Sequence, residues 1–432
     1  MVFARTSLFR AATLAAAILA TASYTGCTTA QQPAPPPAAE APANTRLDYI
    51  TSVVEAHVKA GRIPGAVMLV SQHGRIVYNQ AVGAQDPQAG TPMHPDSIFR
   101  IYSMTKPIVS VAVLQLVEQG RIQLADPIGT YLPELAGLRV GKEEIDARGA
   151  TQLQSVPATR QMTVQDLLRH TSGLTYGIFG KGLVKKQYLD AKVHRPQTNA
   201  SLVQTLGGMP LMFEPGTTWE YSHSTDVLGA LVERVTGKTL DVALKEQILD
   251  PLGMSDTGFW IEPDKQERLA EPFSVDPDTR QPVDLLDVKQ PPTYLSGGGG
   301  MVSTAMDYMR FAQMLLDNGQ LNGVQILSPE MVEFMTSDHL GPAGILETSL
   351  QRGASYLPGP GYGFGLGVGV RVSEGGPAIP GNIGDFYWGG LGGTYFWVDP
   401  REDLVAIWMM QAPGQRTHYR SLFRNLVYSA MP

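Results

Sequence analysis

Apolar residues first recur at helical spacing and then form two apolar runs near the start of the predicted folded region. The stretch LDYITSVVEAHVKAGRI places apolar side chains three and four residues apart and ends at Gly61, which predicts an amphipathic helix. The next stretch, GAVMLVSQHGRIVYNQAVG, contains two apolar runs separated by His73-Gly74. Two such runs around a glycine-containing dipeptide predict antiparallel strands joined by a tight turn.

The middle of the chain, from about residue 120 to 290, is predicted to be mostly helical and rich in loops. Thr163 precedes an apolar periodic run that ends at Gly173. A longer run begins at Ser224 and is interrupted at Gly237. Threonine is common at helix starts and glycine at helix ends, so the first run predicts one helix and the second predicts two.

The C-terminal part returns to β structure and ends in a helix. Three segments, YGFGLGVGVRV, GTYFWVDP and LVAIWMMQ, predict strands, and HYRSLFRNLVYSAM predicts the closing helix. Strands near both ends with helices between them predict an α+β fold, in which one antiparallel sheet is built from both termini and a helical subdomain is inserted. We expect the folded domain over 46–432, with the sheet in about 46–105 and 290–432 and the helices in about 106–289.

Composition narrows the class of protein. The chain has 432 residues, of which 43% are hydrophobic and 17% charged, as expected for a large globular domain. Its formal charge of -7 and the lack of a basic stripe argue against a nucleic-acid partner. The single cysteine, Cys27, excludes an intramolecular disulfide and a cysteine-cluster metal site.

The N-terminus predicts export. Residues 1–27 run from basic residues through a short apolar stretch to small residues and Cys27, as in a signal peptide. The approach to Cys27 resembles the bacterial lipoprotein lipobox, except that Tyr24 stands where an aliphatic residue is usual. We expect lipidation at Cys27 and a periplasmic or outer-membrane lipoprotein, with plain secretion as the alternative; palmitate labelling of wild type and Cys27→Ala distinguishes them. The Pro/Ala-rich segment 28–45 predicts an extended linker.

Ser103 and Lys106 form the first candidate for chemistry, because nowhere else does a lysine stand three residues after a serine. An apolar, helix-like run begins right after Ser103 and continues to about residue 119. Residues three apart share a helix face, so the hydroxyl and the amine would point the same way. A serine beside a base, at a helix N-terminus with free N–H groups, suits acyl transfer. A capping serine and a solvated lysine would explain the same spacing.

Two later segments carry further candidates. Tyr221-Ser222-His223 precedes a predicted helix, and a phenol beside a lysine amine can act as a general base; the alternative is a core tyrosine. Trp388-Gly389-Gly390 precedes a predicted strand, where glycine lets a ligand approach the backbone closely. The alternative there is a glycine hairpin with an exposed tryptophan.

In this order, the three segments resemble the serine β-lactamase and penicillin-binding-protein superfamily, and most closely its class C-like family VIII carboxylesterases. Ser103-x-x-Lys106 matches the first motif. Tyr221-Ser222-His223 stands where the family has Y-x-N or Y-S-x. Trp388-Gly389-Gly390 stands where β-lactamases carry K-T-G and family VIII esterases W-x-G. The resemblance covers about residues 46–430 and implies a β-lactamase/transpeptidase-like fold.

The resemblance also implies catalytic roles. Ser103 would be the acylated nucleophile, and Lys106 and Tyr221 would share the proton transfers. The family needs neither a metal nor an organic cofactor, and the sequence contains no H-E-x-x-H pattern or clustered histidines that would suggest a metal site.

Five further residues are implied to bind substrate or the oxyanion. The backbone N–H groups of Ser103 and Leu391 would form the oxyanion hole, and Trp388, Gly389 and Gly390 would shape the pocket. Without the K-T-G lysine, a substrate carboxylate loses a cationic partner, which favours esters over β-lactams. His223 replaces the asparagine of Y-x-N and would contact substrate, act as acid or base, or lie behind the site.

Three other features have less specific interpretations. His170 could form a Ser–His pair but is better explained as stabilising a turn. Gly297–Gly300 lacks the lysine of a phosphate-binding loop and is predicted to be a flexible turn. The segment 175–200, with aromatic and basic residues, would either line the pocket or form a solvated loop.

The leading hypothesis is a serine hydrolase that cleaves small-molecule carboxylic esters with short to medium acyl chains through an acyl-serine intermediate. The same chemistry would serve a β-lactamase, a D-alanyl-D-alanine carboxypeptidase, or an acyltransferase that uses an alcohol or amine in place of water. An envelope binding or scaffold protein that retains the fold is the non-enzymatic alternative.

Overall fold

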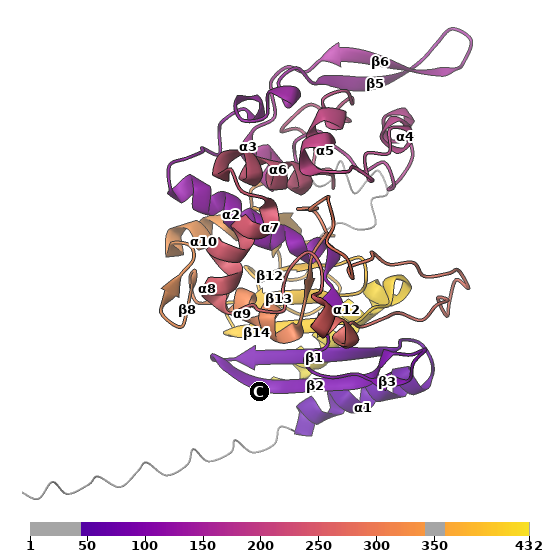
Figure 1. Cartoon of the computed structure of the whole chain (residues 1–432), viewed down its shortest axis with the longest axis vertical. Helices are drawn as coiled ribbons and strands as arrows, with labels where there is room; N and C mark the ends of the chain where they lie inside the picture. The colour runs from indigo at the N-terminus through magenta and orange to yellow at the C-terminus, as the bar shows by residue number, and fades with distance from the viewer. Residues whose placement is uncertain (1–44, 342–358, 432) are drawn as a thin grey trace, which may run out of the picture. The chain divides into compact units, whose positions relative to one another are not determined.

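The computed structural model describes residues 45–341 and 359–431 (Figure 1). All of them belong to one compact unit that begins at Asn44. No helix among them is long and apolar enough to cross a membrane. The predicted signal peptide, Cys27 and most of the linker lie outside the described residues.

The core of the unit is an antiparallel sheet of eight strands in the order β10-β11-β12-β13-β14-β1-β2-β3. The C-terminal strand β14 pairs with the N-terminal strand β1, with Val67 opposite Met409, so the sheet joins both ends of the domain as predicted. The strands are β1 (Gly65–Gln72), β2 (Arg75–Asp86), β3 (Thr91–Pro92), β10 (Tyr362–Phe364), β11 (Gly369–Arg371), β12 (Phe386–Gly389), β13 (Tyr395–Asp399) and β14 (Leu404–Met409).

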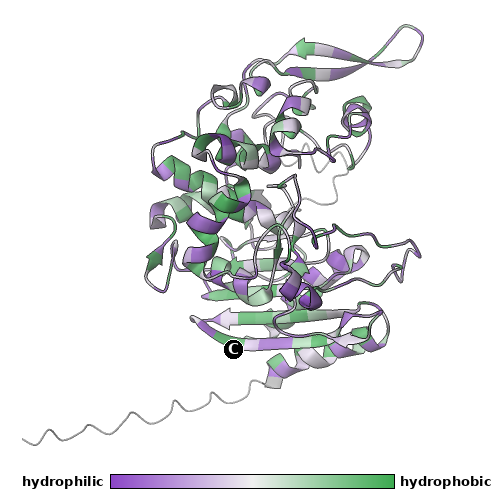
Figure 2. Cartoon of the chain, in the orientation of Figure 1, coloured by the Kyte–Doolittle hydropathy of each residue, from purple (hydrophilic) through white to green (hydrophobic). Residues whose placement is uncertain are grey.

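Helices cover both faces of the sheet, which explains why β1 and β14 are apolar throughout. Successive side chains of a strand point to opposite faces. Val67 and Leu69 therefore join the cluster that contains α9 (Ala305–Leu316). Ala66 and Met68 join the cluster formed with α1 (Thr45–Lys59) and α12 (Arg416–Ala430). The largely apolar course of β1 can be followed in Figure 2.

The helical part follows the first strands. Its central helix α2 (Thr105–Glu118) is buried over most of its length and packs against α6 and α7, so the start of α2 is held rigidly. The other helices here and beyond are α3 (Val164–Leu168), α4 (Leu183–Asp190), α5 (Asn199–Leu206), α6 (Ser224–Thr236), α7 (Leu240–Leu244), α8 (Asp250–Leu252) and α10 (Pro329–Met335).

Several predicted boundaries are confirmed and one is wrong. The turn at His73-Gly74 has φ of 52° and 67°, and Gly237 ends α6 in the left-handed conformation, with φ of 71°. Helix α3 starts after Thr163 as predicted but ends at Leu168, well before Gly173. The helix stops early because His170 takes a left-handed φ of 57°.

The middle region also contains a β-hairpin that was not predicted. Strands β5 (Arg139–Ile145) and β6 (Thr151–Pro157) pair over their full length. Most of their side chains are exposed, so the hairpin lacks the apolar alternation by which a strand is recognised. Short pairs also join β4 (Phe99–Arg100) to β7 (Val302–Ser303) and β8 (Gln320–Leu321) to β9 (Val324–Gln325).

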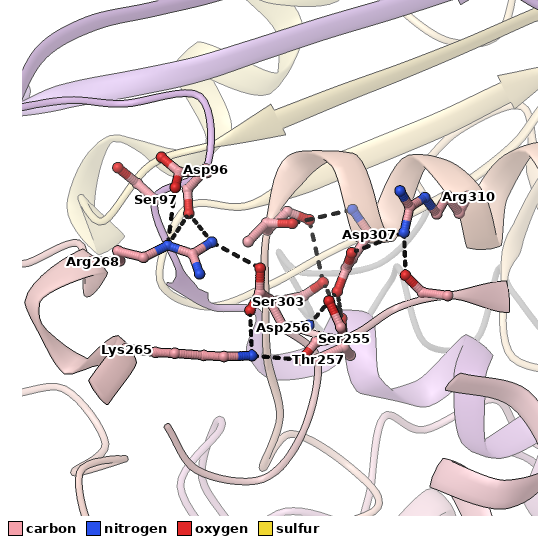
Figure 3. Close-up of polar contacts among 12 residues, drawn as sticks. Asp96, Ser97, Ser255, Asp256, Thr257, Lys265, Arg268, Ser303, Asp307 and Arg310 are labelled. Atoms are coloured by element: carbon pink, nitrogen blue, oxygen red, sulfur yellow. Dashed lines mark hydrogen bonds and ion pairs between the residues drawn. The ribbon is translucent and has the colours of Figure 1, made fainter. Parts of the chain in front are cut away.

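A polar cluster fixes the loop after α8 against the start of α9 (Figure 3). Lys265 and Arg268 both pair with Asp256, at 2.7 and 2.8 Å. The backbone N–H of Asp256 donates to Asp307 at 2.8 Å, and Arg268 also pairs with Asp96 at 3.1 Å. Since the cations of this cluster face carboxylates, we assign it a structural role.

Asp166 is a second structural carboxylate and gives a stability prediction. It is fully buried, forms the capping box of α3 with Thr163, and pairs with Arg160 at 2.6 Å and Arg169 at 3.0 Å. Burial alone would raise the pKa of its carboxyl, but hydrogen bonds from Arg160, Thr163 and Arg169 lower that pKa below its usual value. The ionised form is therefore the one that stabilises the fold.

Asp166→Asn is expected to lower the free energy of unfolding by about 3 kcal/mol at pH 7, because it removes the buried carboxylate that pairs with Arg160 and Arg169. Asp190→Asn, which breaks an exposed pair on α4, should change it by less than about 0.5 kcal/mol. Since the folded pKa of Asp166 lies below the unfolded value of about 3.9, its contribution is present at neutral pH and is lost on acidification. Urea unfolding should give a constant difference between wild type and Asp166→Asn from about pH 7 to 5, which shrinks below about pH 4. Equal effects of the two substitutions would contradict this role.

Candidate active site

Ser103 lies in a strained turn at the entrance to α2. It belongs to the short 3₁₀ helix Tyr102–Met104 that runs directly into α2. Tyr102 has a left-handed φ of 44°, which is unusual for a bulky aromatic residue and typical of functional sites. The Tyr102 hydroxyl accepts a hydrogen bond from the Leu286 N–H at 2.9 Å, which helps to hold this conformation. Ser103 is only half-buried and borders a cavity.

Lys106 is fully buried directly behind Ser103. Its Nζ donates to Ser103 Oγ at 3.3 Å, to Tyr176 Oη at 3.4 Å and to the Gly298 carbonyl at 2.6 Å. The predicted meeting of the Ser103 and Lys106 side chains is thus confirmed. A solvated lysine, the other interpretation, is wrong.

The loop that carries Gly298 is fixed by Asp226. The Asp226 carboxylate accepts from the Gly298 N–H at 2.9 Å, from Ser296 Oγ at 2.6 Å and from His223 Nδ1 at 2.9 Å. Burial alone would raise the pKa of this carboxyl, but the hydrogen bond and charge of His223 and the charge of Lys106 hold that pKa well below its usual range. The segment Gly297–Gly300 therefore holds the Gly298 carbonyl against Lys106. This is a more specific role than that of the flexible turn predicted from the sequence.

Tyr221 is buried on the other side of Lys106. The centroid of its ring lies 4.5 Å from Lys106 Nζ, and its hydroxyl accepts a hydrogen bond from Trp388 Nε1 at 3.4 Å. The ring stacks on Trp219, with centroids 6.0 Å apart and planes 4° from parallel. Tyr176, Tyr221 and Gly298, which are far apart in sequence, thus meet around the Lys106 side chain.

Trp388-Gly389-Gly390 ends strand β12 beside Ser103. Trp388 is buried and packs edge-on against Phe364 at 5.2 Å, so the alternative of an exposed tryptophan is wrong. A Cβ on Gly390 would lie 2.3 Å from the Ile101 carbonyl oxygen. Glycine is therefore required for the backbone before Leu391 to approach the turn that carries Ser103.

A cavity of about 230 Å³ opens at this junction and is lined by Ser103, Tyr221 and the segment from Trp388 to Leu391. Its wall also contains Arg416 and Arg420 from α12, which the sequence did not suggest as site residues. A larger cavity of about 310 Å³, bordered by the loop after α8, contains none of the predicted catalytic residues, so we take the smaller one as the candidate active site.

Tyr176 and Phe179 are also site residues that the sequence did not single out. The Tyr176 ring lies edge-on to Tyr221 at 5.4 Å, and Phe179 lines the cavity. A buried ion pair of 2.8 Å between Lys185 and Glu220 ties this segment to the one that carries Tyr221. Of the two interpretations of segment 175–200, the structure therefore supports pocket lining for its first residues. The aromatic residues were the available signal, but their position depends on contacts across the fold.

The two candidate histidines lie behind the cavity. His170 is fully buried, and its Nδ1 lies 3.2 Å from Ser222 Oγ. Burial and then the Lys106 charge lower the pKa of His170 well below its usual value. Its carbonyl accepts from the Glu220 N–H at 2.9 Å, which supports the turn-stabilising interpretation. His223 is buried against Asp226 and is not among the residues that line the cavity, so contact between His223 and substrate stays a prediction.

Comparison with known proteins agrees with this geometry. A family model described as Beta-lactamase matches residues 50–428. Protein Rv1367c of Mycobacterium tuberculosis is 37% identical over 373 residues, which cover 84% of this chain and 90% of that protein. Esterase EstB of Burkholderia gladioli is 35% identical over 301 residues, which cover 63% of this chain and 70% of EstB. Among solved structures, EstCE1, a hydrolase with promiscuous acyltransferase activity, matches with a TM-score of 0.73 and 26% identity over 89% of this chain and 99% of EstCE1. The predicted resemblance is thereby confirmed: the chain has the β-lactamase/transpeptidase fold and belongs to the beta-lactamase family of serine hydrolases.

Proposed function

We propose that the protein hydrolyses carboxylic esters with short to medium acyl chains through an acyl-Ser103 intermediate. One observation carries the proposal: Ser103, on the wall of a cavity of about 230 Å³, accepts a hydrogen bond from the buried amine of Lys106 at 3.3 Å. The similarity to EstB, named an esterase, and to EstCE1, named a hydrolase, supports ester cleavage.

In acylation, Ser103 Oγ attacks the ester carbonyl carbon. Its proton passes to the amine of Lys106, in its unprotonated form, or through the phenol of Tyr221. The oxyanion that forms is stabilised by the backbone N–H groups of Ser103 and Leu391, and such donors are each worth about 10²–10³ in rate. When the tetrahedral intermediate collapses, the bond to the alcohol breaks, and the same proton is returned to the leaving alkoxide.

In deacylation, water attacks the acyl-Ser103 carbonyl and gives its proton to the same base. The second collapse breaks the bond to Ser103 Oγ, releases the acid and returns a proton to the serine. The hydrogen bond to Gly298 O and the ring of Tyr221 keep the Lys106 amine in place. Fixed positions of this kind lower the cost of bringing the reacting groups together.

Two enzymatic alternatives use the same intermediate. Trp388 stands in place of the K-T-G lysine of β-lactamases. It is buried and hydrogen-bonded to Tyr221, so no cation is available at that position. The similarity to EstB, named an esterase, and EstCE1, named a hydrolase, favours esters over β-lactams and acyl-D-alanyl peptides. Acyl transfer to an alcohol or amine is the second candidate, favoured by the promiscuous acyltransferase activity named for EstCE1. A non-catalytic envelope protein would have no need of a Ser103–Lys106 contact in a cavity.

The test compares initial rates on p-nitrophenyl butyrate and nitrocefin, followed by labelling with a fluorophosphonate and peptide mass spectrometry. We expect ester cleavage with little nitrocefin turnover, and a phosphonyl adduct on the peptide containing Ser103. Ser103→Ala is the matched control and should show neither turnover nor adduct. Dominant nitrocefin turnover would favour a β-lactamase. An unlabelled, inactive wild type would favour the non-catalytic protein, and product diverted to an ester by added alcohol would favour the acyltransferase.

We further propose that the enzyme is exported, with a lipid on Cys27 anchoring it to a membrane. The support is the signal-like pattern of residues 1–27 and the extended composition of the linker that follows. Substrates would then be esters outside the cytoplasm.

A further inference from the structure

The cavity beside Ser103 carries a positive charge. Arg416 and Arg420 line it, and no acidic residue is among the described residues of its wall, although the whole chain has a formal charge of -7. Three tyrosines of the wall, Tyr362, Tyr387 and Tyr395, do not compensate this charge. Burial raises the pKa of each, so these phenols stay neutral at ordinary pH.

The positive charges of Arg416 and Arg420 disfavour each other. Arg416 is the first residue of α12 and Arg420 lies four residues later on the same helix face. The first turn of α12 has no acidic residue, and a positive charge there also opposes the helix dipole. Burial, and to a lesser extent the charge of Arg416, lowers the pKa of Arg420 to about 10, so both guanidinium groups remain charged at neutral pH. A bound anion would stabilise these two positive charges on one cavity wall.

No protein carboxylate supplies that anion among the described residues. Arg420 Nη2 donates to the carbonyls of Gly390 at 2.5 Å and Thr394 at 3.3 Å, and Arg416 Nη1 donates to the Pro413 carbonyl at 2.6 Å. All of these acceptors are neutral. Peptide carbonyls orient a guanidinium group but do not balance its charge.

The fully buried arginines of the described residues have carboxylate partners. The three that are buried in the described part each face a carboxylate: Arg100 with Glu271 at 3.0 Å, Arg371 with Asp385 at 2.9 Å, and Arg424 with Asp385. Arg268 and Arg310 in the polar cluster also face carboxylates (Figure 3). Arg416 and Arg420 differ from these arginines because, within its described ranges, the structure gives neither of them a carboxylate partner.

Gly389 of the W-G-G segment leaves room for the guanidinium group of Arg420. A Cβ on Gly389 would lie 2.5 Å from Arg420 Cζ, so a larger residue would displace the guanidinium group. Arg420 also holds the Gly390 carbonyl directly before Leu391. The segment that lacks a lysine is thus in direct contact with an arginine supplied by α12.

We propose that Arg416 and Arg420 form an anion subsite, so that this enzyme prefers esters that also carry a carboxylate. The inference rests on the proposed ester hydrolysis and names its substrate class. Guanidinium groups bind carboxylates through charge-assisted and often paired hydrogen bonds. The absence of the K-T-G lysine therefore does not leave the pocket without selection for acids, as the sequence suggested, because the cation comes from another element of the fold.

The experiment uses the full chain and two pairs of esters that differ in charge. In the first pair, 4-carboxyphenyl butyrate and 4-carbamoylphenyl butyrate, the charge is on the alcohol side. In the second, mono-4-nitrophenyl adipate and 4-nitrophenyl heptanoate, it is on the acyl side. In at least one pair, kcat/KM of wild type should be about tenfold higher for the charged ester, as one charge-assisted hydrogen bond allows. This ratio should fall as salt is added.

Arg416→Gln and Arg420→Gln should each reduce the charged-to-neutral ratio about tenfold. The ratio is independent of how much active protein each variant yields, so partial misfolding does not imitate the effect. Arg75→Gln removes the same charge from an exposed position on β2 outside the cavity wall and should keep the wild-type ratio. A wild-type ratio of about one or lower in both pairs, or a ratio that neither cavity variant changes, would overturn the proposal.

Binding separates failure of the subsite from failure of the proposed hydrolysis. Calorimetry with Ser103→Ala should show tighter binding of 4-carboxyphenyl butyrate or adipate monoester than of its neutral analogue, and Arg416→Gln in that background should remove the difference. If wild type cleaves no ester but this difference is seen, the subsite stands and the hydrolysis fails. If neutral esters are cleaved through Ser103 and no difference in binding is seen, the hydrolysis stands and the subsite fails.

Discussion

Lys106→Met is expected to lower kcat/KM for p-nitrophenyl butyrate by about 10³, within the range for loss of a general acid–base group. Methionine has nearly the length of lysine and suits the buried position, so the fold should be kept. The loss arises because Lys106 is the group bonded to Ser103 Oγ at 3.3 Å and, without it, the serine has no adjacent amine to take its proton.

Lys106→Arg separates proton transfer from charge. Arginine keeps the positive charge but remains protonated in proteins, so it can stabilise an anion without acting as a base. We expect this variant to lose activity to an extent similar to Lys106→Met. Initial rates, together with thermal unfolding and fluorophosphonate labelling of Ser103, check both variants. Activity of Lys106→Arg close to wild type would show that the lysine acts only through its charge, and activity of Lys106→Met within tenfold of wild type would exclude the role altogether.

The fold was accessible from the sequence where local pattern and burial coincide. The strands β1 and β14 are continuous apolar runs because both faces of the sheet are covered, and their flanking turns end in glycine or polar residues. The β5–β6 hairpin was not predicted for the opposite reason. Most side chains of its strands are exposed, so neither strand shows a pattern of buried apolar residues. Helix α3 ends before the predicted residue because His170 adopts a left-handed backbone conformation. That conformation depends on tertiary contacts, which helix propensity does not describe.

The candidate site likewise contains some residues that could be predicted from the sequence and others that could not. Ser103 and Lys106 were identified from a spacing within one helical turn, and that contact is local. Tyr176 lies within hydrogen-bonding distance of Lys106, and Arg416 and Arg420 line the cavity, but no motif in the sequence indicated these three positions. Arg416 and Arg420 are four residues apart, but only the packing of α12 against the sheet reveals that their shared face borders Ser103. Chemistry that depends on one helix can be predicted from sequence, whereas a pocket wall assembled from several elements requires the structure.

The position of His223 illustrates how the structure changes the meaning of a motif residue. In Y-x-N the third residue is expected to meet substrate, but here it donates to Asp226 at 2.9 Å. Asp226 in turn holds the Gly298 N–H, and the Gly298 carbonyl accepts from Lys106 at 2.6 Å. His223 is thus connected to the Lys106 amine through a carboxylate and a peptide group, while its contact with substrate stays a prediction.

Tyr221→Phe is expected to lower kcat for p-nitrophenyl butyrate by about 10² or more, as for loss of a positioned proton-transfer group. Two phenols lie near Lys106, but of the two only Tyr221 is among the residues that line the cavity with Ser103. The variant keeps the ring that packs on Trp219 and Lys106 and removes only the hydroxyl.

Tyr176→Phe is the matched comparison, because the Tyr176 hydroxyl lies 3.4 Å from Lys106 Nζ but Tyr176 is not among the residues that line the cavity. Its loss should remove one hydrogen bond from the amine and reduce kcat by less than about tenfold, in line with a neutral hydrogen bond worth about 1 kcal/mol. Rates measured from about pH 5 to 10 should show a changed pH profile in Tyr221→Phe and a wild-type profile in Tyr176→Phe. The reverse result, a large loss and a changed profile only in Tyr176→Phe, would move the proton-transfer role to Tyr176. Tyr221 would then be an aromatic wall for the lysine, held in place by the indole of Trp388.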